Sequence, residues 1–129
     1  MPGASPKVGL RKENMTVRKD SVAILEIARN AILTYGWVQG YYGRKEDGFC
    51  LDGALRYATT GEAFAPPGFG TQERGSYKEA GAILWELIKP SRRISMTHWN
   101  DAASRTKTEV LDILKRAIDI ARSGGLNAR

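Results

Sequence analysis

Four segments of this chain repeat apolar residues at the three- and four-residue spacing of a helix face, and this pattern constrains the fold most strongly. The first segment runs from Asp20 or Ser21 to Tyr35, where Asp20 or Ser21 can cap the helix and Gly36 can end it. Its apolar face consists of Ile24, Ile27, Ala28, Ala31, Ile32 and Tyr35. The spacing predicts an α-helix over these residues.

Two further helices are expected in the middle of the chain. One covers about residues 50–59, and Gly61 is placed to end it. The next opens at Ser76, because Ser76 and Glu79 have the spacing of a capping box, in which each side chain bonds an amide of the other residue. Pro90 ends this helix, since the residue before a proline avoids the helical conformation.

The fourth helix opens at Thr106, which forms a second capping-box spacing with Glu109, and ends at Gly124 and Gly125. Three connectors separate these helices. The first, residues 36–48, is aromatic and Gly-rich, and the second, residues 61–75, contains two consecutive prolines. The third, residues 91–100, is compatible with a brief extended segment. Residues 36–48 form either a structured loop or a short hairpin. Connectors of about 14 residues are too long for a minimal up-and-down bundle. We therefore expect an all-α, irregular four-helix domain with long aromatic and Gly/Pro loops.

The chain divides by composition into a basic N-terminal arm (residues 1–19), one helical domain (20–125) and a short tail (126–129). The 20 Lys and Arg residues exceed the 14 Asp and Glu residues, which gives a net charge of +6. Half of this excess lies within residues 1–20. We expect the arm to be flexible, because it has little apolar surface to offset the entropy of ordering, unless Val8, Leu10, Met15 and Val17 dock on the domain. Its charge suits either a solvated segment or contact with nucleic acid or an acidic partner.

Several classes of protein are excluded or disfavoured. No apolar run approaches the roughly 18 residues of a membrane span, and the N-terminus does not have the pattern of a secretory signal, so a cytoplasmic location is expected. A single cysteine, Cys50, excludes an internal disulfide, and with the single histidine, His98, it is too few for an ordinary structural zinc site. The glycines at 68, 70 and 75 match neither a dinucleotide fingerprint nor a phosphate loop. We expect no metal and no cofactor.

One arrangement of residues could support acyl transfer. Cys50 lies at the expected start of a helix, which lowers the pKa of a thiol, and His98 could act as its base. Asn100 or Asp101 could orient the imidazole. The alternative, which we favour, is that Cys50 is a small buried residue and His98 a packing or surface residue. The protein is therefore expected to lack enzymatic activity.

Aromatic residues crowd the segments expected to be loops, and a small basic cluster lies farther along the chain. These residues either anchor the loops onto the helices or form an exposed patch that binds a partner. The candidates for partner binding are Trp37, Tyr41, Tyr42, Phe69, Arg92 and Arg93.

Four short blocks resemble a family of small uncharacterised proteins from actinobacteria and their bacteriophages. The blocks are Gly36-Trp37-Val38-Gln39-Gly40, Cys50-Leu51-Asp52-Gly53-Ala54-Leu55, Trp99-Asn100-Asp101, and Arg105-Thr106 leading into Glu109-Val110 and Ala117. The resemblance covers about residues 22–122 and implies a source rather than a mechanism, because the family has no assigned activity. It implies that Trp37, Cys50, Gly53, Trp99, Asn100 and Asp101 are signature positions. Each has a structural explanation as a loop anchor, a close-packing position, a cap or a buried hydrogen-bonding group.

The leading hypothesis is a small non-enzymatic protein, encoded by a phage or an actinobacterium, that binds a host or viral protein. A nucleic-acid-binding accessory protein is the alternative, because of the basic arm and a second set of cations: Lys89, Arg92, Arg93, Arg105 and Lys107. A Cys-His hydrolase is the third possibility. The fourth helix carries apolar residues on more than one side, which suits either a dimer contact or deeper burial.

Overall fold

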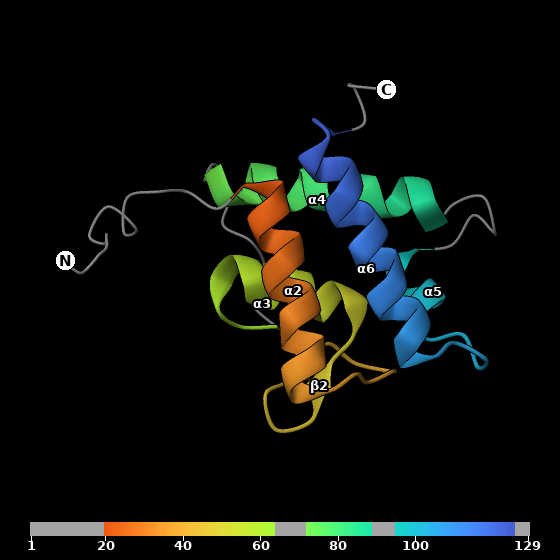
Figure 1. The fold of residues 1–129 in the computed structure, drawn as a ribbon. Helices are drawn as coiled ribbons and strands as arrows, with labels where there is room; N and C mark the ends of the chain where they lie inside the picture. Colours follow the sequence, from red (N-terminus) through yellow and green to blue (C-terminus); the bar gives the residue numbers. More distant parts are fainter. Residues whose placement is uncertain (1–19, 64–71, 89–94, 126–129) are drawn as a thin grey trace.

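The computed structural model describes residues 20–63, 72–88 and 95–125 (Figure 1). These residues form five helices and one two-stranded hairpin. In chain order the elements are α2 (Ser21–Tyr35), β1 (Gly43–Arg44), β2 (Gly48–Phe49), α3 (Leu51–Thr60), α4 (Gln72–Ile88), α5 (Met96–Asn100) and α6 (Lys107–Arg122). The fold is thus mostly helical, as predicted. The N-terminal arm, the double proline, Phe69 and the cluster at 89–93 lie outside the described residues.

Three predicted helices begin and end close to the residues expected. The Asp20 side chain accepts a hydrogen bond from the Ala23 amide at 2.9 Å at the start of α2. Gly61 ends α3 in the left-handed conformation. At the start of α6, Thr106 and Glu109 form both hydrogen bonds of the predicted capping box. These helix ends are confirmed because local hydrogen bonds determine them.

Two predictions in the second half of the chain were wrong. Helix α4 begins at Gln72, so Ser76 and Glu79 lie inside it and their spacing does not mark its start. Residues Met96–Asn100 form the short helix α5, not an extended segment. Ser95 caps this helix by accepting a hydrogen bond from the His98 amide at 3.1 Å. Five residues are too few to show helical periodicity, which explains why the pattern did not reveal α5.

The aromatic segment after α2 folds into the hairpin rather than a plain loop. Gly43 pairs with Phe49, and Arg44 pairs with Gly48, in antiparallel register. Gly48 has a φ angle of 106°, and a Cβ atom there would lie 2.4 Å from the carbonyl carbon of Gly36. Glycine is therefore required where the hairpin turns back against the end of α2.

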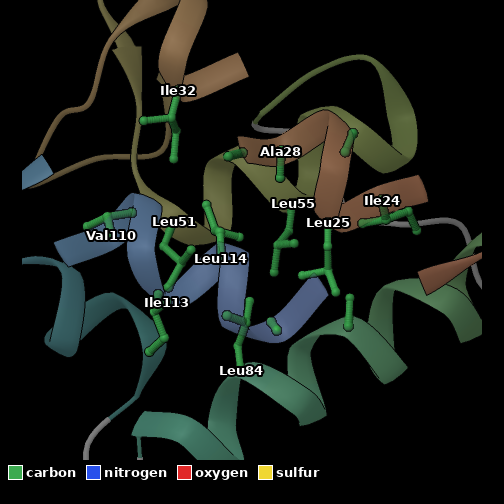
Figure 2. Packing of buried hydrophobic residues seen from close by; sticks show 14 of the residues in the cluster. Ile24, Leu25, Ala28, Ile32, Leu51, Leu55, Leu84, Val110, Ile113 and Leu114 are labelled. Atoms are coloured by element: carbon green, nitrogen blue, oxygen red, sulfur yellow. The ribbon is translucent and has the colours of Figure 1, made fainter. Parts of the chain in front are cut away.

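The core lies between α2, α3, α4 and α6. Figure 1 shows α2 and α6 side by side and antiparallel, with α4 crossing behind them. Figure 2 shows the side chains that meet between these helices, among them Ile24, Leu25, Ala28, Ile32, Leu51, Leu55, Leu84, Val110, Ile113 and Leu114. The buried face of α2 differs from the predicted one, because Leu25 is buried whereas Ile27 and Tyr35 are each 36% exposed. Because α2 packs against both α3 and α6, its buried surface includes Leu25.

Candidate functional site

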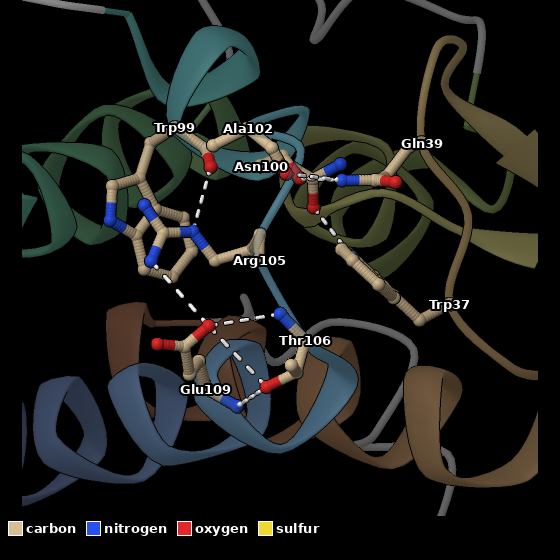
Figure 3. A network of polar contacts seen from close by, with 8 residues as sticks. All are labelled: Trp37, Gln39, Trp99, Asn100, Ala102, Arg105, Thr106 and Glu109. Atoms are coloured by element: carbon tan, nitrogen blue, oxygen red, sulfur yellow. Dashed lines mark hydrogen bonds and ion pairs between the residues drawn. The ribbon is translucent and has the colours of Figure 1, made fainter.

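A buried carboxamide, that of Asn100, joins α5 to the segment that follows α2 (Figure 3). Its Oδ1 accepts hydrogen bonds from the indole Nε1 of Trp37 at 2.7 Å and from the backbone amide of Leu51 at 3.0 Å. Its Nδ2 donates to the carbonyl oxygen of Val38 at 3.1 Å and to Oδ1 of Asp101 at 2.9 Å. Two donors and two acceptors use the full capacity of the amide and fix its orientation.

Two further contacts hold the same segment against α5. The Gln39 side chain donates from Nε2 to the carbonyl oxygens of Asn100 at 3.0 Å and Ala102 at 2.9 Å (Figure 3). The Gly40 amide donates to Oδ1 of Asp101 at 3.0 Å. We call Trp37, Gln39, Asn100 and Asp101 the Asn100 node. The node joins residues about 60 positions apart in the sequence, and therefore fixes the position of the hairpin that follows.

A second polar group ties α5 to the start of α6. The guanidinium carbon of Arg105 lies 3.9 Å from the centre of the Trp99 ring, and Arg105 Nε donates to the Trp99 carbonyl oxygen at 2.8 Å (Figure 3). A carboxylate oxygen of Glu109 lies 3.6 Å from Arg105 Nη1 and also accepts from the Thr106 amide. Arg105, which belongs to the cation set of the nucleic-acid hypothesis, is thus held by contacts within the domain.

The structure places Cys50 and His98, the two central residues of the Cys-His hypothesis, in different environments. Cys50 is buried, and its Sγ accepts a hydrogen bond from the Gly53 amide at 3.2 Å as the N-cap of α3. His98 is exposed, and its Nδ1 lies 3.2 Å from the Ser95 hydroxyl. Asn100 and Asp101 hold the segment after α2 through the node. Asn100 and Asp101, which the hypothesis assigned to orienting the His98 imidazole, are thus hydrogen-bonded to residues of that segment.

The expected lowering of the Cys50 pKa is wrong. Burial raises the pKa of the thiol to about 11, and this effect exceeds the opposing effect of the Gly53 amide hydrogen bond. A thiol with this pKa stays protonated near neutral pH, whereas the thiolate is the nucleophilic form. The geometry therefore favours a capping and packing role for Cys50.

Close packing at Gly53 joins α3 to the segment before the hairpin. A Cβ atom at this position would lie 1.9 Å from the carbonyl oxygen of Tyr42. That oxygen accepts a hydrogen bond from the Cys50 amide at 3.1 Å, and the Arg56 guanidinium lies 4.5 Å from the centre of the Tyr42 ring. Tyr42 is thus part of the packing between hairpin and helix.

A buried carboxylate, that of Asp52, connects α3 to α4. The Tyr77 hydroxyl donates to Oδ1 of Asp52 at 2.7 Å, and Arg56 Nε donates to Oδ2 at 3.1 Å. Burial and the neighbouring Asp52 charge raise the pKa of Tyr77. Only the Asp52–Arg56 spacing of four residues was visible in the sequence, because Tyr77 lies on another helix.

The hairpin exposes a second group of residues. Tyr41 is 43% exposed, and its hydroxyl donates to Oδ2 of Asp47 at 2.7 Å. Arg44 Nε donates to the same carboxylate oxygen at 2.7 Å. The hydrogen bonds from Tyr41 and Arg44 lower the pKa of Asp47. These contacts tie Tyr41 and Arg44 to the turn, while the Tyr41 side chain stays partly exposed.

An open pocket of about 230 Å³ lies beside the hairpin, and we call it the hairpin pocket. Its aromatic residues are Phe49 and Tyr57, whose ring centres are 4.8 Å apart. The Lys45 ammonium lies 5.8 Å from the ring centre of Tyr57 and 5.8 Å from that of Tyr35. The other lining residues are Gly43, Arg44, Glu46, Gly61, Glu62 and Ala63. An apolar interior with charged residues at its edge is typical of a site that takes a side chain of another molecule.

The residues proposed for partner binding thus have different positions. Trp37 belongs to the Asn100 node, Tyr42 packs against α3, and Tyr41 is exposed on the hairpin. Phe69, Arg92 and Arg93 lie outside the described residues. In the part of the chain that the structure describes, no group of three or more His, Cys, Asp or Glu side chains could hold a metal ion. None of the helices within these residues is both long and apolar enough to cross a membrane.

Comparison with known proteins identifies a family model that covers most of this chain. The model of a family of unknown function, DUF6197, matches residues 17–120 of this chain. The matched region includes the Asn100 node, the hairpin pocket and all but the last residues of α6. No curated protein and no solved structure matches the chain.

Proposed function

Because the chain belongs to the DUF6197 family, whose function is unknown, we propose from its geometry that it acts without catalysis and binds a host or viral protein through the hairpin pocket. The observation that carries the proposal is the pocket itself, with the exposed rings of Tyr35 and Tyr41 on the adjoining segments. The resemblance to actinobacterial and phage proteins supports a partner from the host cell or the virus.

The size of the pocket favours a protein side chain over a larger ligand. Small-molecule sites usually occupy about 300 to 1,000 Å³, which exceeds the 230 Å³ of this pocket. Protein interfaces often place one aliphatic or aromatic anchor in a pocket of this kind, with polar residues around it. Lys45, Glu46 and Glu62 supply such a polar edge.

The Asn100 node supports binding by holding the hairpin in place before a partner arrives. Trp37 and Gln39 are hydrogen-bonded to α5 residues, and the chain then leads directly into the hairpin. A surface that is already ordered loses less conformational entropy on binding. In this proposal, the polar residues of the four family-like sequence blocks hold the fold together, while the hairpin contacts the partner protein.

The charge of the described residues gives less support to nucleic-acid binding. They contain 11 Lys and Arg and 13 Asp and Glu, whereas the whole chain contains 20 and 14. The positive excess therefore lies in residues 1–19, 89–94 and 126–129. Nucleic-acid affinity depends mainly on contacts between cations and phosphates, so this alternative depends on those three segments.

Site-specific photocrosslinking tests the proposal. A photoreactive phenylalanine analogue replaces Lys45 at the pocket edge or, as a control, the exposed Lys78 of α4. We expect a crosslinked protein from the host or phage at position 45 and not at position 78. With that partner purified, Lys45→Glu and Tyr41→Ala should each weaken binding by about tenfold. Equal crosslinking at both positions, or unchanged affinity of both variants, would refute the proposal.

A further inference from the structure

The antiparallel pair of α2 and α6 forms one exposed face of the molecule (Figure 1). Glu26 forms an ion pair with Arg122 near the start of α2, and Leu33 and Lys115 line the same groove farther along. The groove between the two helices has a volume of about 350 Å³. The two helices run in opposite directions and rise by the same distance per residue. Asn30 lies four residues after Glu26, and Ile118 lies four residues before Arg122, so Asn30 and Ile118 lie at the same height along the helix pair.

Helix α2 carries a short apolar ridge on this face. Ile27 is 36% exposed and Leu33 is 48% exposed, and Asn30 lies midway between them. Residues three apart form one of the ridges by which helices pack. In an antiparallel pair of α2 helices centred on Asn30, each Ile27 lies level with Leu33 of the other copy. The two Asn30 carboxamides then face each other, and each can both donate and accept.

Helix α6 carries a stripe of four exposed charges, of which Lys115, Asp119 and Arg122 line the groove. The stripe consists of Asp112, Lys115, Asp119 and Arg122, whose spacing of three, four and three residues keeps them in line. Their signs alternate along the helix. In an antiparallel pair centred on Ala117, Asp112 faces Arg122 of the other copy and Lys115 faces Asp119, so every charge meets its opposite.

The two patterns share one centre. The apolar residues of α2 are placed symmetrically about Asn30, and the charges of α6 pair with their opposites about Ala117. The contacts across the groove place Asn30 and Ala117 within one residue of the same height along the helix pair. We propose that this face binds a second copy of the chain around a twofold axis near Asn30 and Ala117. A nucleic acid or an acidic lipid surface would need a face of one sign, whereas this stripe carries both.

The dimer depends on a surface separate from the hairpin pocket. The apolar ridge supplies most of the contact, and the charges select the antiparallel register, because exposed ion pairs add little affinity but disfavour wrong pairings. The hairpin follows the end of α2, so an antiparallel dimer presents its two pockets at opposite ends. The association holds whether or not the pocket binds a partner.

Sedimentation equilibrium at concentrations up to about 1 mM tests this arrangement, since an association with a micromolar Kd is saturated there. We expect the mass to approach twice the 14.2 kDa of one chain. Lys115→Asp should weaken association by at least about tenfold, because the new carboxylate then faces Asp119 of the other copy. The double variant Lys115→Asp with Asp119→Lys again places opposite charges at 115 and 119 of the two copies, and its Kd should return to within about threefold of the original value.

Two controls separate this result from other effects. Lys78→Asp makes the same charge reversal on the exposed part of α4 and should leave the Kd unchanged. Tyr41→Ala should also leave it unchanged, whatever it does to partner binding. Circular dichroism confirms that each variant is folded. A monomer at the highest concentration, an unaffected Lys115→Asp variant, or a double variant that fails to restore association would overturn the proposal.

Discussion

At the scale of single residues, the two ends of the Asn100 carboxamide face opposite kinds of partner. Its oxygen faces two N–H donors, and its nitrogen faces a carbonyl and a carboxylate oxygen. A buried group with four matched partners is costly to alter, because each change leaves a donor or acceptor without a partner. The sequence indicated that Asn100 could be a cap or a buried hydrogen-bonding group, but not which residues it would bond.

Asn100→Asp tests this pairing. The new carboxylate oxygen would face the carbonyl of Val38 and the carboxylate of Asp101, so we expect a loss of about 2–4 kcal/mol in the free energy of unfolding near pH 7. Burial and Asp101 raise the folded-state pKa of the new group, so the folded state binds the proton more tightly and the loss shrinks as pH falls toward 4. Urea unfolding at both pH values measures it. The exposed Asn30→Asp, in dilute solution, should show no such pH-dependent loss.

Cys50 shows why a helix start alone does not determine thiol chemistry. The start of α3 was predicted correctly, but the burial of the thiol depends on packing between distant segments. Because the folded-state pKa is about 11 and the ordinary value is 9.0, the thiol contributes stability that is complete below pH 9 and lost as pH rises toward 11.

Cys50→Ser should remove this contribution while keeping a side chain that can cap α3. We expect the difference in unfolding free energy between the original protein and the variant to fall by about 2–3 kcal/mol from pH 9 to pH 11. Denaturant unfolding across this range measures the difference. A constant difference would show that the thiol is not shielded from water, and fast alkylation of the folded protein at neutral pH would show the same.

At the scale of elements, the helix ends that depend on local hydrogen bonds could be predicted from the sequence, and the others could not. Thr106 and Glu109 are neighbours on one turn, so their spacing was enough. Ser76 and Glu79 have the same spacing inside α4, where it carries no information about the start. The contact between Gly53 and Tyr42 joins two elements, and nothing in the spacing of glycines indicates it.

Two glycines within helices should therefore respond in opposite ways to alanine. Gly53→Ala places a methyl group against the backbone of Tyr42, and we expect it to cost about 2–4 kcal/mol of stability. Gly75→Ala, in the open first part of α4, should stabilise the protein by about 0.5–1 kcal/mol, because alanine favours the helix. Thermal unfolding of both variants gives the comparison. Similar effects at the two positions would contradict the close packing at Gly53.

At the scale of the whole molecule, charge and packing are distributed unevenly along the chain. The described residues carry slightly more acidic than basic groups, although the net charge of the chain is +6. Helical content and absence of a long apolar span followed from composition and periodicity. The hairpin pocket did not, because it forms only when residues from β1, β2 and the end of α3 meet.

The central claim is that Trp37, Gln39, Asn100 and Asp101, the residues of the Asn100 node, hold the scaffold together. Hydrogen exchange of the Trp37 indole N–H and the Leu51 amide tests it most directly, because both donate to the same oxygen of Asn100. We predict that both exchange only when the whole protein unfolds, with the same free energy of opening as the buried amides of α2. Faster exchange of the two groups while α2 stays protected would show that the node opens on its own and would contradict the claim.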